Sequence, residues 1–104
     1  MAEASRPEPQ RGVYGISVAA ELTGVNAQML RTYEAKGLLE PHRTDGGTRR
    51  YSQGDLTRVN RISSLLDDGL NLAGIAQVLA LEAETRRLQN EVERLEDRLR
   101  RKRS

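Results

Sequence analysis

Residues 26–51 read NAQMLRTYEAKGLLEPHRTDGGTRRY, and this stretch decides how the rest of the chain can be arranged. Its first residue, Asn26, is of a type that caps helices by accepting a hydrogen bond from a backbone N–H of the first turn. Good helix formers follow as far as Gly37, which suits the left-handed position just past a helix end. We therefore expect a short helix between Asn26 and Gly37.

The second half of this stretch predicts a β-hairpin. Two short runs, residues 41–43 and 48–51, flank an Asp-Gly-Gly tip, which is a typical hairpin turn. The flanks carry Arg43, Arg49 and Arg50 and almost no apolar side chain that a core could bury. We therefore expect an exposed, basic wing.

Upstream, residues 18–23 are expected to form a first helix with Ser17 as its N-cap. The apolar face of this helix would comprise Val18, Ala19 and Leu22. A brief apolar alternation over residues 14–18 is too short to predict a strand. Gly24 then allows a tight corner before the next helix, and this spacing is typical of a helix-turn-helix.

Downstream, Ser52 and Asp55 predict a variant of the capping box at the start of another helix. The buried face of that helix would follow a 3.6-residue period: Leu56, Val59, Ile62, Leu65 and Leu66. Gly69 marks its end, and Asn71 is expected to cap the next helix. The buried side of that next helix would comprise Leu72, Ile75, Val78 and Leu79.

From Val78 onward the apolar residues follow a heptad repeat. One position of the repeat holds Val78, Thr85, Val92 and Leu99, and the other holds Leu81, Leu88 and Leu95. About three heptads is near the minimum useful length of a coiled coil, and so polar a helix would not be stable alone. We expect these residues to form a homodimeric coil. The alternative is that the stripe folds back onto the same small domain.

Composition excludes several classes of protein. A chain of 104 residues forms one domain at most, with a helical extension. Without cysteine it has no thiolate metal site and no disulfide. The chain has one histidine, no Ser with a base at a plausible spacing and no Gly-rich phosphate loop. We therefore do not expect an enzyme, and we expect no cofactor or metal. The first 12 residues are polar, with neither a signal peptide nor a membrane span, so a cytoplasmic protein is expected.

The positive charge is almost wholly arginine, 15 Arg against 2 Lys, although the net charge is only +2. Arginine is favoured for planar, bidentate contact with phosphate or guanine. High-GC coding or surface solubility would produce the same bias. The C-terminal run of cations would be either a second phosphate-binding surface or a solvated helix end, and the helix dipole alone favours cations there. The run comprises Arg94, Arg98, Arg100, Arg101, Lys102 and Arg103.

Residues 16–79 resemble the N-terminal DNA-binding domain of the MerR family of bacterial regulators. The matching stretches are ISVAAELTGV, MLRTYEAKGLL, EPHRTDGGTRRYS and NLAGIAQVL, which together span about two thirds of the chain. Within the family, the combination of AQMLRTYEAKGLLEPHRTDGGTRRYS with DDGLNLAGIAQVL is most similar to the heat-shock repressor (HspR) branch.

The resemblance implies a mainly α fold: a winged helix-turn-helix with a small β-hairpin wing, followed by a C-terminal dimerisation helix that pairs in an antiparallel coiled coil. The expected parts are a disordered arm at residues 1–12, a DNA-binding domain at residues 13–80, and a dimerisation helix with a basic end at residues 81–104. The implied partners are double-stranded DNA with an inverted repeat, a second copy of the chain, and the DnaK chaperone as co-repressor. No small-molecule effector is evident, because no room is left for a ligand-binding domain after the coil.

Carried over by position, the helix that begins near Asn26 would enter the major groove and read bases from its first turns. We expect Ala27, Gln28 and Arg31 to lie nearest the base edges, with Gln28 suited to adenine and Arg31 to guanine or phosphate. The resemblance places five further residues at the DNA backbone: Tyr33, Arg43, Arg49, Arg50 and Tyr51.

Each of these assignments has an alternative. Tyr33 and Tyr51 could belong to the core, and Arg31 could be an ordinary surface residue. Because successive side chains of a strand point to opposite faces, only one of Arg49 and Arg50 is expected to face DNA.

The expected function is a dimeric transcription factor that represses heat-shock and chaperone genes, in the cytoplasm and associated with the nucleoid. One alternative is another short MerR-like regulator, developmental or activating. A second, from a different class, is a coiled-coil interaction adaptor whose helix-turn-helix is vestigial.

Overall fold

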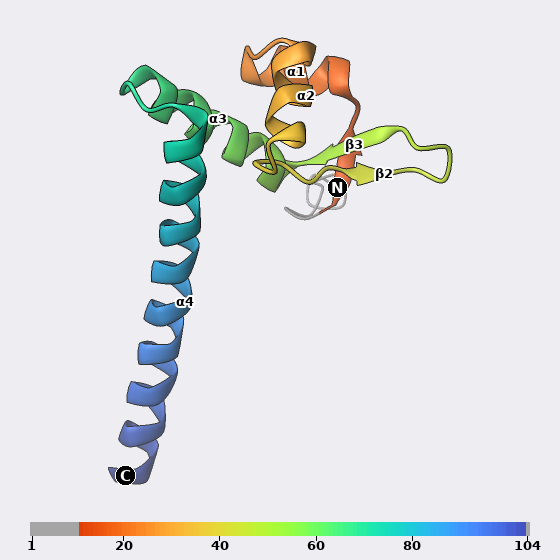
Figure 1. The fold of residues 1–104 in the computed structure, drawn as a ribbon. Helices are drawn as coiled ribbons and strands as arrows, with labels where there is room; N and C mark the ends of the chain where they lie inside the picture. Colours follow the sequence, from red (N-terminus) through yellow and green to blue (C-terminus); the bar gives the residue numbers. More distant parts are fainter. Residues whose placement is uncertain (1–10, 104) are drawn as a thin grey trace. The chain divides into compact units, whose positions relative to one another are not determined.

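The computed structural model of the protein describes residues 11–103. The elements are β1 (Gly12–Tyr14), α1 (Ile16–Thr23), α2 (Ala27–Ala35), β2 (His42–Arg43), β3 (Arg49–Ser52), α3 (Gln53–Asp67) and α4 (Leu72–Arg103) (Figure 1). They divide into two compact units, one reaching Leu72 and the other beginning at Ala73. The expected mainly helical fold with a small wing is confirmed. None of the helices described is long and apolar enough to cross a membrane.

A strand that the sequence did not predict extends the wing into a three-stranded antiparallel sheet of order β1-β3-β2. Gly12 pairs with Ser52 and Tyr14 with Tyr51, with an irregularity between them. A Cβ on Gly12 would lie 2.9 Å from the Arg50 backbone oxygen, so only glycine allows this approach. The expected disordered arm at residues 1–12 therefore ends too late, because Gly12 belongs to β1; residues 1–10 lie outside the described part.

The first helix begins earlier than expected. α1 begins at Ile16 with the extended Gly15 as N-cap, so Ser17 lies inside the first turn and is not the cap. Val18 and Leu22, expected on the buried face, are exposed. The inner face instead comprises Ile16, Ala19, Ala20 and Thr23. α1 packs against α2, α3 and β3, and small side chains on its inner face allow that close approach.

The predicted caps of α2 are confirmed at both ends. The Asn26 side chain accepts a hydrogen bond from Met29 N at 2.8 Å. Gly37 has φ +76° and follows the helix end, where Leu38 N donates to Tyr33 O and Gly37 N donates to Glu34 O. These two bonds form a Schellman motif. Both ends of α2 are therefore set by local sequence.

The predicted wing is also confirmed. Arg43 pairs with Arg49 and His42 with Arg50, and the hairpin extends away from α1 and α2 (Figure 1). At the tip, Thr44 and Thr48 exchange backbone and side-chain hydrogen bonds, and Gly47 takes φ +85°.

α3 carries the expected capping box and the centre of the core. Ser52 Oγ accepts from Asp55 N at 3.0 Å, and the Asp55 carboxylate accepts from Ser52 N at 2.9 Å. The buried apolar residues of the first unit are Ala19, Leu30, Tyr33, Leu38, Leu39, Tyr51, Leu56, Val59, Ile62 and Leu65. They come from α1, α2, the following loop, β3 and α3, so burial by all these elements fixes α2 against the rest of the unit.

α4 is a single continuous helix (Figure 1). Asn71 directly precedes it, at the position expected of the cap. Ile75 and Leu79 are buried, whereas Leu72 and Val78 are half-buried. The expected division at residues 80 and 81 falls within this unbroken helix.

Candidate DNA-binding surface

The outer face of α2 presents exposed polar side chains near the start of the helix. Its first turn begins at Ala27, which is half-buried, and Gln28 and Arg31 lie three residues apart and are exposed. Residues at this spacing share one helix face. Asn26 is exposed too, but its side-chain oxygen is engaged in capping. The first turns of α2 therefore present one amide and one guanidinium side by side.

The opposite side of α2 is fixed by the core. Leu30 and Tyr33 are buried, and the Tyr33 hydroxyl is hydrogen-bonded to the Ser63 side chain. Burial raises the pKa of Tyr33 above its ordinary value of 10.0, and the Ser63 hydrogen bond partly offsets the rise. Tyr33 thus lies where the core alternative places it. Leu30 and Tyr33 thus hold α2 in place from its buried side, opposite the exposed face.

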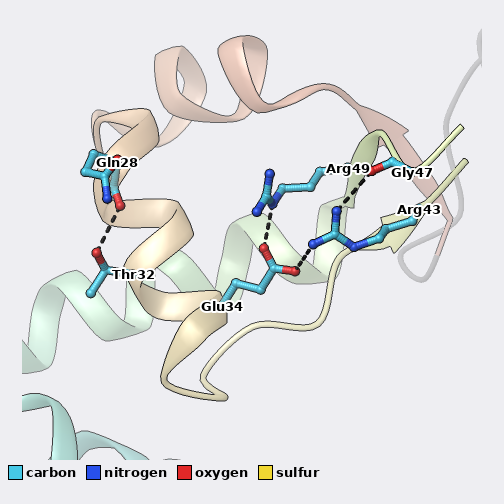
Figure 2. Close-up of polar contacts among 6 residues, drawn as sticks. All are labelled: Gln28, Thr32, Glu34, Arg43, Gly47 and Arg49. Carbon is cyan, nitrogen blue, oxygen red and sulfur yellow. Dashed lines mark hydrogen bonds and ion pairs between the residues drawn. The ribbon is translucent and has the colours of Figure 1, made fainter.

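Two wing arginines converge on a single carboxylate of α2. Arg43 Nη2 donates to Glu34 Oε2 at 2.6 Å, and Arg49 Nε donates to Glu34 Oε1 at 2.5 Å (Figure 2). Arg43 Nη1 also donates to Gly47 O at 3.0 Å. We call Glu34, Arg43 and Arg49 the Glu34 clamp.

The clamp perturbs the ionisation of its own members. Desolvation would raise the pKa of Glu34, but the hydrogen bonds from Arg49 and Arg43 outweigh it, so the pKa is lowered from its ordinary value of 4.5. The pKa of Arg49 is raised, chiefly by its hydrogen bond to Glu34. Both shifts favour the charged forms of Glu34 and Arg49, so the ion pair between them is favoured near neutral pH.

Arg50 lies on the other face of β3. Its side chain is exposed, and its Nη1 atom is 3.1 Å from where a Cβ on Gly15 would lie, beside the start of α1. Arg49 and Arg50 therefore point to different faces, as strand alternation requires.

Tyr51 is wholly buried at the base of the wing. Burial is the main cause that raises the pKa of Tyr51, and charges on Arg49, Glu34 and Arg31 also act on it. Among the described residues its hydroxyl finds no hydrogen-bond partner. A buried hydroxyl without a partner is uncommon, because such a group has lost its water. Tyr51 thus places an unsatisfied donor within reach of the charges of Arg49 in the wing and Arg31 in α2.

Glu34 and Arg58 matter here although the sequence did not single them out. Glu34 is the one acidic residue of α2, and an acid facing a basic wing is the signal that could have pointed to it. Arg58 on α3 donates from Nε to Leu38 O at 2.5 Å and so fixes the chain between α2 and the wing. Nothing in the spacing of Arg58 distinguishes it from other helix-surface arginines.

The second candidate surface is the outer stripe of α4. Its large apolar side chains are 44% to 66% exposed: Leu81, Leu88, Val92, Leu95 and Leu99. Beside them lie ion pairs within the helix, Arg87 with Glu84 and Arg94 with Glu91. Within residues 11–103, no group of His, Cys, Asp or Glu is placed to hold a metal ion.

Comparison with known proteins agrees with this geometry. Residues 14–82 match the family model of the MerR HTH family regulatory proteins. The chain is 46% identical over 78 residues to a protein of Streptomyces coelicolor named heat shock protein HspR, covering 74% of this chain and 52% of that one. It is 40% identical over 70 residues to the HTH-type transcriptional regulator GlnR of Bacillus anthracis, covering 67% and 54%. The chain thus spans about half the length of these relatives.

Among solved structures, the fold is similar to that of HiNmlR, a MerR family regulator lacking the sensor domain, bound to promoter DNA. The TM-score is 0.58 at 25% identity, and the match covers 83% of this chain and 77% of that one. The family match, residues 14–82, covers more than half of the chain. The chain therefore belongs to the MerR HTH family of regulatory proteins and has the helix-turn-helix fold of that family.

Proposed function

We propose that two copies of this chain bind an inverted-repeat operator and repress heat-shock and chaperone genes. The observation that carries the proposal is the exposed face of α2 with Gln28 and Arg31, on a helix that Glu34 ties to an arginine-rich wing. The heat-shock assignment rests on the similarity to HspR. The finer parts of the proposal follow from the chemistry of the two candidate surfaces.

Base reading falls to the first turns of α2. Gln28 pairs with adenine and Arg31 with guanine, since each side chain can make two hydrogen bonds to one base edge in the major groove. Each such pair is worth about 1–3 kcal/mol of discrimination against a wrong base. Asn26 and Ala27 approach the same edges from the helix start, where recognition helices contact bases.

Phosphate contact falls to the wing and its base. Arg50 lies beside the N-terminus of α1, where the helix dipole adds to its positive charge. Arg43 and Arg49 approach a second phosphate while they remain joined to Glu34. The Tyr51 hydroxyl, which has no hydrogen-bond partner among the described residues, is the group of the wing base that would donate to a phosphate oxygen, whereas Tyr33 supports α2 from the core.

The α4 stripe pairs two copies in the antiparallel sense that the family resemblance implies. The residues at this interface are Val78, Leu81, Thr85, Leu88, Val92, Leu95 and Leu99. The exposed leucines and valine support this proposal, because an unpaired apolar stripe on so polar a helix gains stability from a partner. The length of the coil then sets the spacing of the two half-sites.

Control of the repressor is assigned to a protein partner, the DnaK chaperone acting as co-repressor. The similarity to HspR supports a heat-shock role, and the chaperone follows from the resemblance to that branch. Unfolded proteins that draw the chaperone away on heating would then relieve repression.

The test is genome-wide occupancy by crosslinked immunoprecipitation, before and after a brief heat shock. We expect enrichment at inverted repeats upstream of chaperone genes, and we expect it to fade on heating. Sharp peaks at other genes that ignore temperature would favour another short regulator, a rival that the similarity to GlnR supports.

The adaptor alternative is tested by a double substitution, Arg31→Ala with Arg49→Ala. Loss of every occupancy peak is expected if DNA binding is the function. An unchanged cellular phenotype in that variant, together with no sharp peaks in the wild type, would leave the coil as the functional element.

A further inference from the structure

The wing is joined to α2 by polar contacts. Residues 42–50 read HRTDGGTRR and include no apolar side chain, so no hydrophobic contact can hold the hairpin beyond its base. Only two residue pairs join β2 to β3. Below them Tyr51 is buried, which anchors the base of the hairpin but not its tip.

Glu34 also offsets the repulsion between the two arginines of the clamp. Arg43 and Arg49 are directly opposed across the two strands. Like charges in opposed positions destabilise a strand pair. Glu34 accepts from both guanidinium groups at once, one with each carboxylate oxygen. The same carboxylate therefore relieves the repulsion and ties the hairpin to the helix.

The position of Glu34 is unfavourable for DNA binding taken by itself. A carboxylate on the helix that approaches the duplex repels phosphates and neutralises part of the positive charge of the wing. Its side chain is 20% exposed, against 45% for Arg43 and 28% for Arg49, so it lies beneath the arginines and faces the protein. This is the placement of a group that orients the phosphate-binding side chains and does not itself touch the ligand.

We infer that Glu34 is a positioning residue that sets the wing against the base-reading face of α2 and thereby raises sequence discrimination at the expense of overall DNA affinity. The inference rests on the proposed DNA-binding function. With the clamp intact, the phosphates held by the wing and the bases met by Gln28 and Arg31 come into register together. Without it, the wing binds phosphates at many registers, and its two arginines are no longer neutralised in part.

The test compares Glu34→Gln with Glu40→Gln in the full chain. Both variants lose one carboxylate, but Glu40 is exposed in the loop between α2 and β2. The probes are a duplex enriched by the wild-type protein from a random pool, and a scrambled duplex of equal length and composition. Affinity for each is measured at several salt concentrations, after circular dichroism has confirmed that each variant is folded.

We expect Glu34→Gln to lower the ratio of selected to scrambled affinity about tenfold, which is the scale of one misplaced base contact. Scrambled binding should stay equal or tighten, with a steeper salt dependence, because the wing gains net positive charge. Glu40→Gln should leave the ratio within about twofold of wild type, since surface charge acts on both duplexes alike. An equal change of the ratio in both variants would overturn the inference.

Glu34→Asp separates geometry from charge. It keeps the negative charge, but its shorter side chain cannot span Arg43 and Arg49 together. We expect it to lower the ratio without tightening scrambled binding. A ratio equal to wild type in Glu34→Asp and Glu34→Gln alike would exclude a positioning role.

A measurement on the free protein keeps this inference distinct from the proposed function. If the wild type enriches no sequence, the proposed function fails, and positioning is judged from the backbone mobility of Gly46, Gly47 and Thr48 by ¹⁵N nuclear Overhauser effects. We expect these residues to become more mobile in Glu34→Gln and not in Glu40→Gln. Equal mobility in wild type and Glu34→Gln would contradict the inference whatever the DNA result.

Discussion

α2 and the wing meet at one surface, but different forces hold them in place. α2 buries Leu30 and Tyr33 and has well-formed caps at both ends. Residues 42–50 of the wing include no apolar side chain, and Glu34 joins the wing to α2. Apolar burial is insensitive to moderate salt, whereas partly exposed ion pairs are screened by it. The comparison contrasts a helix that is held by apolar burial with a hairpin that is held to it by partly exposed ion pairs.

The largest expected effect comes from the packing of α2. Leu30→Ala opens a cavity at a fully buried position and should lower the free energy of unfolding by about 2–5 kcal/mol. Leu22→Ala, on the exposed side of α1, should change it by less than about 0.5 kcal/mol. Urea denaturation measures both. Equal losses in the two variants would mean that α2 is not anchored by this core.

The next effect is expected at the base of the wing. Gly12→Ala places a Cβ against the Arg50 backbone oxygen, and the shift that must follow should cost about 1–3 kcal/mol of stability. Gly46→Ala is the matched control, because its Cβ would meet only Thr44 Oγ1 at 3.9 Å and its φ is not in the left-handed region. Thermal unfolding distinguishes them. An unchanged melting temperature in Gly12→Ala would show that β1 and β3 are not closely packed at this position.

A smaller effect separates the stability of α2 from its contact with DNA. Asn26→Ala removes the hydrogen bond to Met29 N and should cost about 1 kcal/mol of unfolding free energy. Gln28→Ala, on the exposed face, should change stability by less than about 0.5 kcal/mol while still weakening binding to a selected duplex. If Gln28→Ala destabilised the fold as much as Asn26→Ala, its side chain would have a structural role that the geometry does not show.

The smallest effect is the pH dependence of the clamp. Because the pKa of Glu34 is lower in the folded chain than its ordinary 4.5, the unfolded chain takes up the proton first on acidification. The contribution of Glu34 to stability, at most about 1 kcal/mol after solvent screening, is then complete above about pH 4.5 and is lost as the pH falls through the folded-state pKa. The stability difference between wild type and Glu34→Gln should therefore shrink on acidification. A difference that stays constant from pH 7 to pH 3 would contradict the clamp.

Local signals in the sequence were enough to predict α2, the wing and α3. Asn26, Gly37 and the Ser52–Asp55 box act within one turn of their own backbone, so their roles can be read without tertiary structure. The exposed stripe of α4 followed from its period in the same way.

Features that depend on distant partners could not be predicted. β1 exists because β3 offers a strand edge and Gly12 allows the close approach, and nothing within residues 12–14 indicates either. The start of α1 was misplaced because burial against α2 and α3 selected its small-residue face over Val18 and Leu22. The role of Glu34 needed a hairpin that brings Arg43 and Arg49, nine and fifteen residues away, to one carboxylate.

The proposal that α2 reads bases and the wing binds phosphates is tested most directly by comparing Arg31→Ala with Arg50→Ala. The affinity of each variant is measured for a selected duplex and its single-base variants. Arg31→Ala should relax preference at one base pair, at a cost of about 1–3 kcal/mol there. Arg50→Ala should weaken binding to every variant alike and reduce the log–log salt slope by about 0.9, as loss of one phosphate contact does. If Arg31→Ala weakened all sequences equally while Arg50→Ala relaxed a base preference, the assignment of reading to α2 and phosphate binding to the wing would be wrong.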